Sequence, residues 1–584
     1  MTRSKIKIFN TEGVCLTSKH YMVPALERIH GVIPLIDAEK YFVIHAPRQS
    51  GKTTFLSELI KKINSDGKYY ALNCSLGTTK GIHNENTAFE YVAESLIDSA
   101  ETSQIPAIQM LANRLMPLRE RGNNIRIKIM LRCLCANLDK DLVVFFDEID
   151  ALEEPMIVTF LAQLRDGYLY RDWPNNQFPR SLALVGLRNI RDYRSKLSQN
   201  GQSGESGSPF NVKHQSLFLP DFSKVDIQNL YNQHTLASGQ KFDDSAIDRA
   251  WHWTQGQPWL VNKLAYDIIN FQLNNDFSKK ISEFHFNEAA KNLIFQNEAH
   301  FESLEKRLKE PLVKNIMEAV ITGADYLPFE LLDEDVQLCL DLGLLKSVEV
   351  KIEEKHEDES KKMTSAFQPA NPIYSEVIIK ELTSNILAAT PASYATRWMD
   401  GDRIDMSGLL EAFQNYWHRH SPVLTSQQSL NLIISQSISD IFSRIHLISS
   451  TESANEIAEV SARHLIGSIT RLVNESYCLL VLLAFLQRTL NGGADFVDRE
   501  VAAGRGRVDI CVGYGQRRYL LELKIKGNMS LENSIGQILR YMNAFQESEG
   551  WLVIFDRNIP KSSEEILPAT THVIGDKIIH VITC

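Results

Sequence analysis

Residues 46–54, Ala-Pro-Arg-Gln-Ser-Gly-Lys-Thr-Thr, have the types and spacing needed to bind a nucleoside triphosphate. They match the pattern Gly-x-x-x-x-Gly-Lys-Ser/Thr except for alanine at the first position. In that pattern the second glycine lets backbone N–H groups turn toward phosphates, the lysine reaches the β- and γ-oxygens, and the hydroxyl holds Mg²⁺. The alanine weakens the match slightly, because a residue with a Cβ tolerates fewer backbone angles. We predict ATP and Mg²⁺ as cofactors, bound by Ser50, Gly51, Lys52, Thr53 and Thr54.

Two acidic residues follow an apolar run farther along the chain. Residues 142–146 are consecutively apolar, as in a buried strand, and Asp147 and Glu148 come directly after them. An aspartate there can hold Mg²⁺ through water, and a glutamate can polarise the water that attacks the γ-phosphate. Acidic residues also commonly end strands as loop or capping residues. The phosphate-binding pattern upstream favours the catalytic interpretation.

A second group of charged residues lies near the C-terminus. Residues 504–512 and 519–525 predict two neighbouring strands. Side chains two positions apart on a strand share a face, so Glu522 and Lys524 lie on one side, where Asp509 can reach them. Two carboxylates can bind Mg²⁺ and a lysine can orient or activate water, which is the minimum set for metal-dependent phosphodiester cleavage. The simpler alternative is a solvated hairpin face with a cross-strand ion pair.

Alternating strands and helices must position the nucleotide-binding residues. Apolar runs predict strands at 41–45, 69–73, 142–146 and 181–186. Helical spacing follows residue 52, a long helical stretch with few breakers fills most of 87–138, and another helix covers 154–166. This alternation predicts a parallel sheet covered by helices on both faces.

The first half of the sequence resembles the AAA+/STAND type of P-loop ATPase. The resemblance rests on a strand between the Lys52 and Asp147 motifs and on a later strand that ends at Arg188. It implies that Arg188 senses the γ-phosphate. The alternative is a surface arginine that pairs with Asp192.

Two further segments carry this resemblance. Gly256-Gln257-Pro258 matches the Gly-x-Pro of the STAND lid, which implies that Pro258 packs on adenine, although a plain break between helices is the alternative. Residues 9–13, 20–22 and 45–49 resemble bacterial proteins of this ATPase family that carry a C-terminal nuclease domain.

The C-terminal pattern Asp509…Glu522-x-Lys524 resembles the PD-(D/E)xK nuclease core. Gln537 and Tyr541, four apart and therefore on one helix face, match the Gln-x-x-x-Tyr of RecB-like members. The resemblance also makes Glu475 the candidate for the family's helical glutamate, although Glu475 is as well explained as an acid in the first turn of a helix.

The nuclease-like stretch is locally basic. Residues 499–526 contain seven basic and three acidic residues, whereas the whole chain has 62 basic and 72 acidic residues and a formal charge of −10. A basic stretch in an acidic chain is a credible phosphate-binding patch. Any contact with nucleic acid must therefore be local.

Length and composition limit the remaining classes. A chain of 584 residues with 44% hydrophobic and 23% charged residues is expected to form several globular domains. No apolar run approaches the ~20 residues that cross a bilayer, no signal peptide is expected, and eight scattered cysteines favour reduced thiols. We therefore expect a cytoplasmic protein without membrane contact.

The expected fold class is multidomain α/β with five parts. They are a P-loop ATPase domain at 1–215, a helical lid at 216–300, a winged-helix-like domain at 301–384, a helical connector at 385–470 and a PD-(D/E)xK nuclease-like domain at 471–584.

The function expected from these resemblances is an ATPase whose nucleotide state controls a Mg²⁺-dependent nuclease. Antiviral defence or DNA processing follows from the resemblance alone. The expected partner is nucleic acid, DNA before RNA, and self-association through the ATPase domain is compatible with the family. One alternative is a STAND-like switch or scaffold that keeps a non-cleaving nuclease fold for binding. Another is a DNA-loading ATPase in which the winged helix recognises DNA.

Overall fold

The computed structural model divides the chain into two compact units. The first contains Met1–Gln296, Glu330–Glu349 and Ala370–Tyr374, and the second contains Asn297–Phe329, Val350–Pro369 and Ser375–Cys584. The residues that the structure describes are 6–187, 216–295, 299–321, 333–351, 363–382, 398–400, 403–424, 478–486, 489–490, 496–503, 506–515, 517–526, 530–556 and 567–584.

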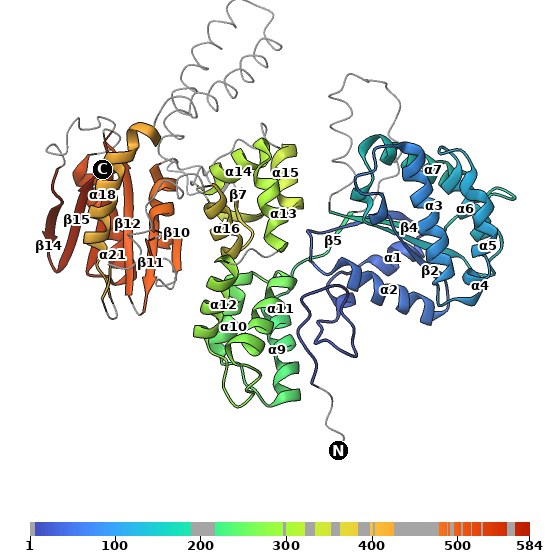
Figure 1. Cartoon of the computed structure of the whole chain (residues 1–584), viewed down its shortest axis with the longest axis horizontal. Coiled ribbons are helices and arrows are strands. Elements are labelled where there is room, and N and C mark those ends of the chain that lie inside the picture. The colour runs from blue at the N-terminus through green and yellow to red at the C-terminus, as the bar shows by residue number, and fades with distance from the viewer. Residues whose placement is uncertain are drawn as a thin grey trace, which may run out of the picture. The chain divides into compact units, whose positions relative to one another are not determined.

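A five-stranded parallel sheet forms the centre of the first unit (Figure 1). Its strands lie in the order β2-β3-β4-β1-β5, and every pair runs parallel. The four strands expected from the apolar runs are present, and a fifth continues the sheet beyond residue 215, where we expected the ATPase domain to end. The strands are β1 (Tyr41–His45), β2 (Tyr70–Ser75), β3 (Leu142–Asp147), β4 (Ser181–Gly186) and β5 (Ser216–Phe218).

Helices cover both faces of this sheet (Figure 1). On one face α1 (Val32–Asp37) and α2 (Lys52–Asp66) share a core with the side chains of Phe42, Ile44 and Phe145. The helices between β2 and β3, together with α7 (Glu154–Tyr170), form the core on the other face. Because both faces are covered, β3 and β4 are buried along their whole length, which explains their continuous apolar runs.

The segment between β2 and β3 is helical over most of its length, as expected, but it is divided into several helices. Pro106 stands in the first turn of α4 and Pro117 lies within η3, and proline cannot continue a preceding helix because it lacks a backbone N–H. The segment therefore consists of α3 (Glu85–Glu101), α4 (Pro106–Gln109), α5 (Ala112–Leu115), η3 (Met116–Glu120) and α6 (Arg126–Ala136).

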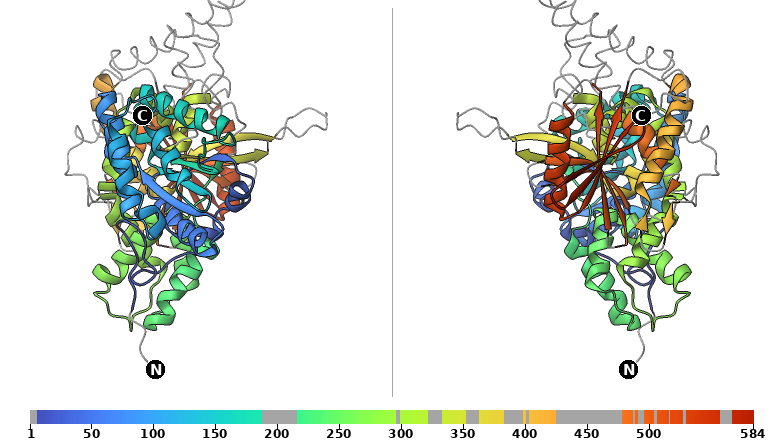
Figure 2. Two further views of the ribbon diagram at one scale, coloured as in Figure 1. Left: turned by 90° about the vertical axis from the view of Figure 1, so that its right-hand side faces the viewer. Right: turned by 90° about the vertical axis from the view of Figure 1, so that its left-hand side faces the viewer.

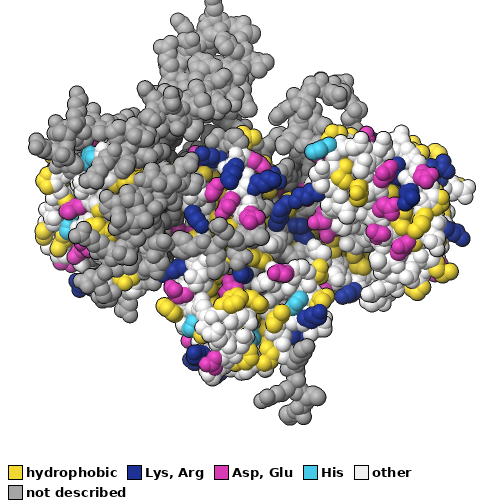
Figure 3. Space-filling view, viewed as in Figure 1, with side chains coloured by type: hydrophobic (Ala, Val, Ile, Leu, Met, Phe, Trp, Pro, Cys, Tyr) yellow, Lys and Arg dark blue, Asp and Glu magenta, His cyan; other side chains and the backbone are white. Residues whose placement is uncertain are grey.

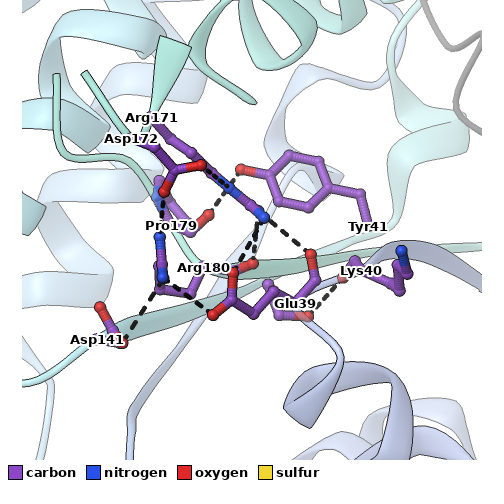
Figure 4. Close-up of polar contacts among 9 residues, drawn as sticks. Glu39, Lys40, Tyr41, Asp141, Arg171, Asp172, Pro179 and Arg180 are labelled. Atoms are coloured by element: carbon purple, nitrogen blue, oxygen red, sulfur yellow. Dashed lines mark hydrogen bonds and ion pairs between the residues drawn. The ribbon is translucent and has the colours of Figure 1, made fainter. Parts of the chain in front are cut away.

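An ion-pair network joins the amino ends of β1 and β4 (Figure 4). Glu39 pairs with Arg171 at 3.1 Å and with Arg180 at 3.0 Å, and Arg180 pairs with Asp172 at 2.7 Å. The hydroxyl of Tyr41 donates to the carbonyl oxygen of Pro179 at 2.8 Å. This network lies at the edge opposite the phosphate-binding segment, which follows the carboxyl end of β1. It can fix the strands without taking part in the site.

Helices follow the sheet within the first unit (Figure 1). The expected break at 254–258 is present, since α10 ends at Thr254 and α11 begins at Pro258. The helices are α9 (Lys224–Ser238), α10 (Asp244–Thr254), α11 (Pro258–Asp267) and α12 (Glu283–Phe295).

The stretch predicted as a winged helix contains helices followed by two strands. The strands β6 and β7 form a two-stranded sheet, and parts of the stretch belong to each of the two units. The boundaries 301 and 384 stay a prediction. The elements are α13 (Ala299–Leu308), α14 (Pro311–Ile321), α15 (Asp333–Asp341), β6 (Leu345–Lys351), β7 (Met363–Pro369) and α16 (Pro372–Leu382).

A six-stranded mixed sheet forms the C-terminal domain in the second unit. Its order is β10-β11-β12-β13-β15-β14. The first three strands are antiparallel, and β13 then pairs parallel with β12. The elements are β10 (Phe496–Ala503), β11 (Gly506–Tyr514), β12 (Arg517–Ile525), α21 (Leu531–Phe545), β13 (Glu549–Phe555), β14 (Thr570–Ile574) and β15 (Lys577–Thr583).

Helices lie on both sides of this sheet (Figure 2, right). The helix α21 packs on β12 and β13, while α18 (Met406–Leu424) packs against β15. The expectation of a purely helical connector at 385–470 is wrong in one detail, because the two-residue strands β8 (Met399–Asp400) and β9 (Arg403–Ile404) pair before α18. Residues 425–470 of the connector lie outside the described residues. Within the described ranges, no helix combines the length and apolar character needed to span a bilayer.

Candidate functional site

The phosphate-binding segment connects the end of β1 to the start of α2. Left-handed backbone angles occur at Gln49, with φ of 58°, and at Gly51, with φ of 88°. The alanine at position 46 is buried and its N–H donates to the carbonyl of Gly186 at 3.2 Å. The left-handed backbone angles thus occur at Gln49 and Gly51. The alanine in place of the first glycine therefore disturbs the loop less than the sequence indicated. Ser50 is buried and its hydroxyl donates to the carbonyl of Pro47 at 2.8 Å, which closes the loop.

Lys52 lies where this loop meets the acidic residues. Its ammonium donates to the carbonyl oxygens of Ala46 at 2.7 Å and Pro47 at 2.6 Å. Burial lowers the pKa of Lys52 to about 8, and this shift is opposed by the nearby carboxylates of Asp147 and Asp150. A lysine held among carbonyls beside a helix N-terminus supplies the positive charge that phosphate oxygens require.

The acidic pair lies at the carboxyl end of β3. Asp147 is 4% exposed, and burial raises the pKa of its carboxyl to about 6 while Lys52 acts in the opposite direction. Its Oδ1 accepts the N–H of Glu148 at 2.9 Å. Glu148 has a positive φ of 58° and an exposed side chain whose Oε2 accepts the hydroxyl of Ser75 at 2.8 Å. The predicted metal ligand is therefore buried, and the predicted catalytic glutamate is held by a residue at the end of β2.

Sequence analysis missed three residues that support this pair. Ser75 bonds Glu148, and a Cβ at Gly77 would force the Glu148 carboxylate out of its present position. Asp150 accepts the N–H of Leu187, just beyond the end of β4. Ser75 could have been identified from the sequence, because it is a polar residue at the end of β2, the strand next to β3. The role of Asp150 could not, because it depends on β4 lying beside β3.

Thr53 and Thr54 begin α2 but differ in their surroundings. Thr53 is exposed next to the loop, so its hydroxyl is accessible to a bound cation. Thr54 instead accepts the backbone N–H of Cys15 through Oγ1 at 3.1 Å. The same N-terminal segment accepts the indole N–H of Trp259 at the carbonyl of Thr11, at 2.9 Å. The N-terminal segment therefore connects the phosphate-binding helix to α11, a link that the sequence did not indicate.

Pro258 occupies the first turn of α11 and is buried. The preceding Gln257 caps the helix through its side chain, which accepts the N–H of Leu260 at 2.6 Å. Gly256 has φ of 86°, and a Cβ there would collide with the carbonyl of Phe222. The Gly-x-Pro sequence thus has a packing reason, and adenine contact by Pro258 stays a prediction. Arg188 lies outside the described residues.

The C-terminal charged residues come together on the sheet. The Nζ of Lys524 lies 2.6 Å from Oε1 of Glu522, and Oδ2 of Asp509 accepts the N–H of Leu523 at 2.6 Å. This last bond joins β11 to β12 just beyond their backbone pairing, because the pairing begins at Ile510, the residue after Asp509. The three residues that the sequence proposed therefore form one group.

Burial sets the protonation of this group. Glu522 is 0% exposed, and burial followed by the negative charge of Asp509 raises its pKa to about 7, although Lys524 opposes the shift. Burial acts to lower the pKa of Lys524, but Glu522 and Asp509 outweigh it and the pKa rises. Among the described residues, the buried Oε2 atom of Glu522 has no hydrogen-bond partner. A buried carboxylate oxygen without a partner beside a second carboxylate fits a divalent cation.

Two predicted accessory residues lie near this group. The Nε2 of Gln537 donates to the hydroxyl of Tyr541 at 2.9 Å, and the negative charges of Glu522 and Asp509 contribute to a raised pKa of Tyr541, after burial. Glu475 lies outside the described residues. Within the described ranges, no three acidic, histidine or cysteine side chains gather as a metal site.

Only part of the basic patch can be located. Arg517 and Arg518 are exposed at the start of β12, and the guanidinium carbon of Arg518 lies 5.5 Å from the centroid of the Phe545 ring. Arg505 and the side chain of Arg507 lie outside what the structure describes. On the face shown in Figure 3, the described acidic and basic side chains of the first unit are intermixed.

The family comparison applies to the nucleotide-binding half. Residues 35–353, more than half of the chain, match the family described as AAA-like domain, and the chain therefore belongs to this family of P-loop ATPases, whose members bind ATP or ADP, typically with Mg²⁺. Residues 460–558 match a domain of unknown function, DUF8371. Neither family is described as a nuclease, so the nuclease resemblance stays a proposal. No curated protein matches the sequence.

Solved structures similar to this chain include three archaeal proteins. The Walker-type ATPase PABY2304 of Pyrococcus abyssi is 14% identical with a TM-score of 0.41, and the match covers 63% of this chain and 99% of that one. The ORC2 protein of Aeropyrum pernix, in ADPNP-ADP complexes, is 13% identical with a TM-score of 0.35, covering 61% and 91%. Cdc6p of Pyrobaculum aerophilum is 11% identical with a TM-score of 0.33, covering 62% and 95%.

Proposed function

We propose that this AAA-like ATPase uses its nucleotide state to control Mg²⁺-dependent cleavage of nucleic-acid phosphodiester bonds by its C-terminal domain. The observation that carries the proposal is the group formed by Asp509, Glu522 and Lys524, with the Lys524 ammonium 2.6 Å from the Glu522 carboxylate. A solvated hairpin face would leave these charges in water, but Glu522 is fully buried. Burying a charged group is costly unless a partner or a metal compensates for it.

The chain's own residues divide the chemistry. Asp509 and Glu522 would hold the cation, which when bound polarises the phosphate and lowers the pKa of a nucleophilic water. Lys524 can hold that water, or stabilise the negative charge that develops on the phosphate. Gln537 and Tyr541 are joined at 2.9 Å on one face of α21, where they can orient a strand of nucleic acid. Arg517 and Arg518 add exposed positive charge for the phosphate backbone.

In the ATPase half, Lys52 and Thr53 would bind the phosphates and Mg²⁺, Asp147 would hold Mg²⁺, and Glu148 would polarise the attacking water. The hydrogen bond from Ser75 engages Oε2 of Glu148 at 2.8 Å and restrains how this carboxylate can turn toward a water. Slow turnover is therefore compatible with the geometry. An ATPase that rests in this state suits a switch that controls another domain.

The deciding experiment incubates the purified full chain with plasmid, linear and single-stranded DNA and with RNA, each with Mg²⁺, and each with ATP, with ADP and without nucleotide. The proposal expects cleavage that depends on Mg²⁺ and changes with the nucleotide, and it expects DNA to be the better substrate. Asp509→Asn is the matched inactive variant. Asp556→Asn is the control, because Asp556 pairs with Lys526 at 2.5 Å at the end of the neighbouring strand.

Two outcomes would contradict the proposal. Cleavage that persists in Asp509→Asn, in preparations free of contaminating nuclease, would remove the site assignment. Nucleic-acid binding without cleavage in any nucleotide state would instead support the scaffold alternative, in which the C-terminal domain binds and does not cut.

A further inference from the structure

Arg28 joins three parts of the nucleotide-binding unit without being part of the phosphate-binding motif. Its Nη2 atom donates to the carbonyl oxygens of Ser50 at 2.8 Å and Pro220 at 2.5 Å. Its guanidinium lies over the ring of Phe222, 4.9 Å from the centroid. One side chain therefore contacts the phosphate-binding loop and the segment that leads from β5 into α9.

We propose that Arg28 is a positioning residue that orients the phosphate-binding loop and fixes it to the turn that begins α11. The first step of the argument is the peptide between Ser50 and Gly51. In a trans peptide the C=O and the following N–H point in opposite directions. Arg28 holds the Ser50 carbonyl on its own side of the loop, and the Gly51 N–H therefore points to the other side, where phosphate is bound.

The glycine of the motif is part of the same arrangement. A Cβ at Gly51 would lie 3.0 Å from Nη1 of Arg28, and φ at this position is 88°. Position 51 thus needs glycine for its backbone angle and also for the close approach of the guanidinium. The carbonyl of Ser50 would otherwise be free to rotate toward the phosphates, where its partial negative charge would repel them.

The second step leads from Arg28 to α11. Phe222, whose ring lies under the guanidinium, donates its N–H to the carbonyl of Gly256 at 2.9 Å. A side chain at Gly256 would collide with Phe222, so the two backbones are in direct contact. The turn at Gly256 leads directly into Pro258. Arg28 therefore connects the loop that binds phosphate to the helix whose first residue is the candidate adenine contact.

The charge of Arg28 is retained at neutral pH. Burial lowers the pKa of Arg28 to about 10, and Asp221 and Asp226 act against this shift. A charged donor to a neutral carbonyl forms a stronger hydrogen bond than a neutral donor. The loss of such bonds typically lowers the equilibrium constant of the folding or binding step that depends on them by about tenfold or more.

Another arginine of the same unit provides a matched control. Arg171 also donates to two backbone carbonyls, those of Glu39 at 3.2 Å and Arg180 at 2.9 Å, and lies over an aromatic ring, with Tyr168 at 4.3 Å. It lies at the opposite edge of the same sheet. Arg171 also forms an ion pair with Glu39, so Arg171→Gln removes at least as many interactions as Arg28→Gln, but only Arg28 touches the phosphate-binding loop.

The test measures binding of Mg²⁺-ATP, Mg²⁺-ADP and adenosine by calorimetry, the KM and kcat of ATP hydrolysis, and the thermal unfolding of each variant without nucleotide. Arg28→Gln should weaken ATP and ADP binding by about tenfold or more and raise KM more than it lowers kcat. Adenosine binding should change less. Arg171→Gln should lower the unfolding temperature by a similar amount and leave nucleotide affinity unchanged.

Arg28→Lys tests the geometry if Arg28→Gln does not fold. A lysine keeps the charge but cannot reproduce the planar fork that reaches two carbonyls and stacks on a ring, so an intermediate affinity is expected. Wild-type affinity for ATP in Arg28→Gln or in Arg28→Lys would overturn the proposal. An equal loss of ATP affinity in Arg171→Gln would also overturn it, because the effect would then be one of general stability.

Discussion

The two candidate sites each contain a lysine beside buried carboxylates, yet the pKa values of these lysines move in opposite directions. Lys52 donates to two neutral carbonyls, and burial lowers its pKa to about 8. Lys524 contacts the Glu522 carboxylate directly, and the pKa of Lys524 rises. For these two lysines, the group in direct contact with the ammonium has more influence on the direction of the pKa shift than carboxylates that lie nearby without touching it. It also separates the two roles, since Lys52 is available to a phosphate while Lys524 is bound to a cation ligand.

The largest effect is expected at the C-terminal group. Asp509→Asn or Lys524→Ala should reduce nucleic-acid cleavage by several orders of magnitude, because each removes a cation ligand or the group that orients water; a loss of more than about 4 kcal/mol corresponds to roughly a thousandfold. Gel-based cleavage rates under single-turnover conditions measure this. ATP hydrolysis should persist in both variants, and its loss would mean that the two sites are not independent.

The corresponding change in the phosphate-binding loop is the next largest. Lys52→Ala should abolish measurable ATP binding, since the loop loses its only lysine, whereas Glu148→Gln should bind ATP and not turn it over. Calorimetry measures binding, and phosphate release measures turnover. Unchanged ATP affinity in Lys52→Ala would show that the loop assignment is wrong. Because the proposal couples cleavage to the nucleotide state, cleavage by Lys52→Ala should stay Mg²⁺-dependent but no longer change when ATP or ADP is added.

The protonation of Glu522 should make the C-terminal site depend on pH. The pKa of this carboxyl is about 7, above its usual value of 4.5, so a proton competes with Mg²⁺ at neutral pH. Mg²⁺ affinity should fall by up to about tenfold for each pH unit below 7. Because the folded form holds this proton more tightly than the unfolded form, the metal-free domain gains stability at low pH, and this stability is lost as the pH rises through 7. Metal titrations and thermal unfolding between pH 5.5 and 8.5 measure both effects, and a flat profile would contradict the assignment.

The smallest effect is expected from the hydrogen bond that holds Glu148. Ser75→Ala removes the donor at 2.8 Å and frees the carboxylate to orient water. If this hydrogen bond contributes about 1 kcal/mol to the barrier, its removal should raise ATP turnover about fivefold. ATP affinity should stay the same. A turnover that falls in Ser75→Ala would show that Ser75 positions Glu148 for catalysis and does not restrain it.

Local patterns in the sequence were enough for several of the elements that carry these residues. The apolar run before Asp147 and the pattern around Lys52 place both residues at strand ends, because a buried parallel strand needs apolar residues on both faces. The two-residue spacing of Glu522 and Lys524 correctly placed them on one side of a strand. The helical stretch expected at 87–138 is present, but the pattern of apolar residues did not show where Pro106 and Pro117 divide it into separate helices.

The sequence by itself determined the features that depend on residues close together along the chain. The glycine and lysine of the phosphate-binding loop, the strand that ends at Asp147, and the shared face of Glu522 and Lys524 are of this kind. Their geometry follows from backbone periodicity and from the conformational freedom of glycine, which act over a few residues.

Only the tertiary structure decided which distant residues complete the sites. Arg28 is 22 residues from Ser50 and 192 from Pro220, and Ser75 is 73 residues from Glu148. No periodicity links such positions, since strand order in the sheet determines which chain ends meet. The burial that raises the pKa of Glu522 and leaves its Oε2 without a partner likewise comes from packing between α21 and the sheet. Desolvation depends on which residues surround a group in the folded protein, so the sequence pattern alone does not determine it.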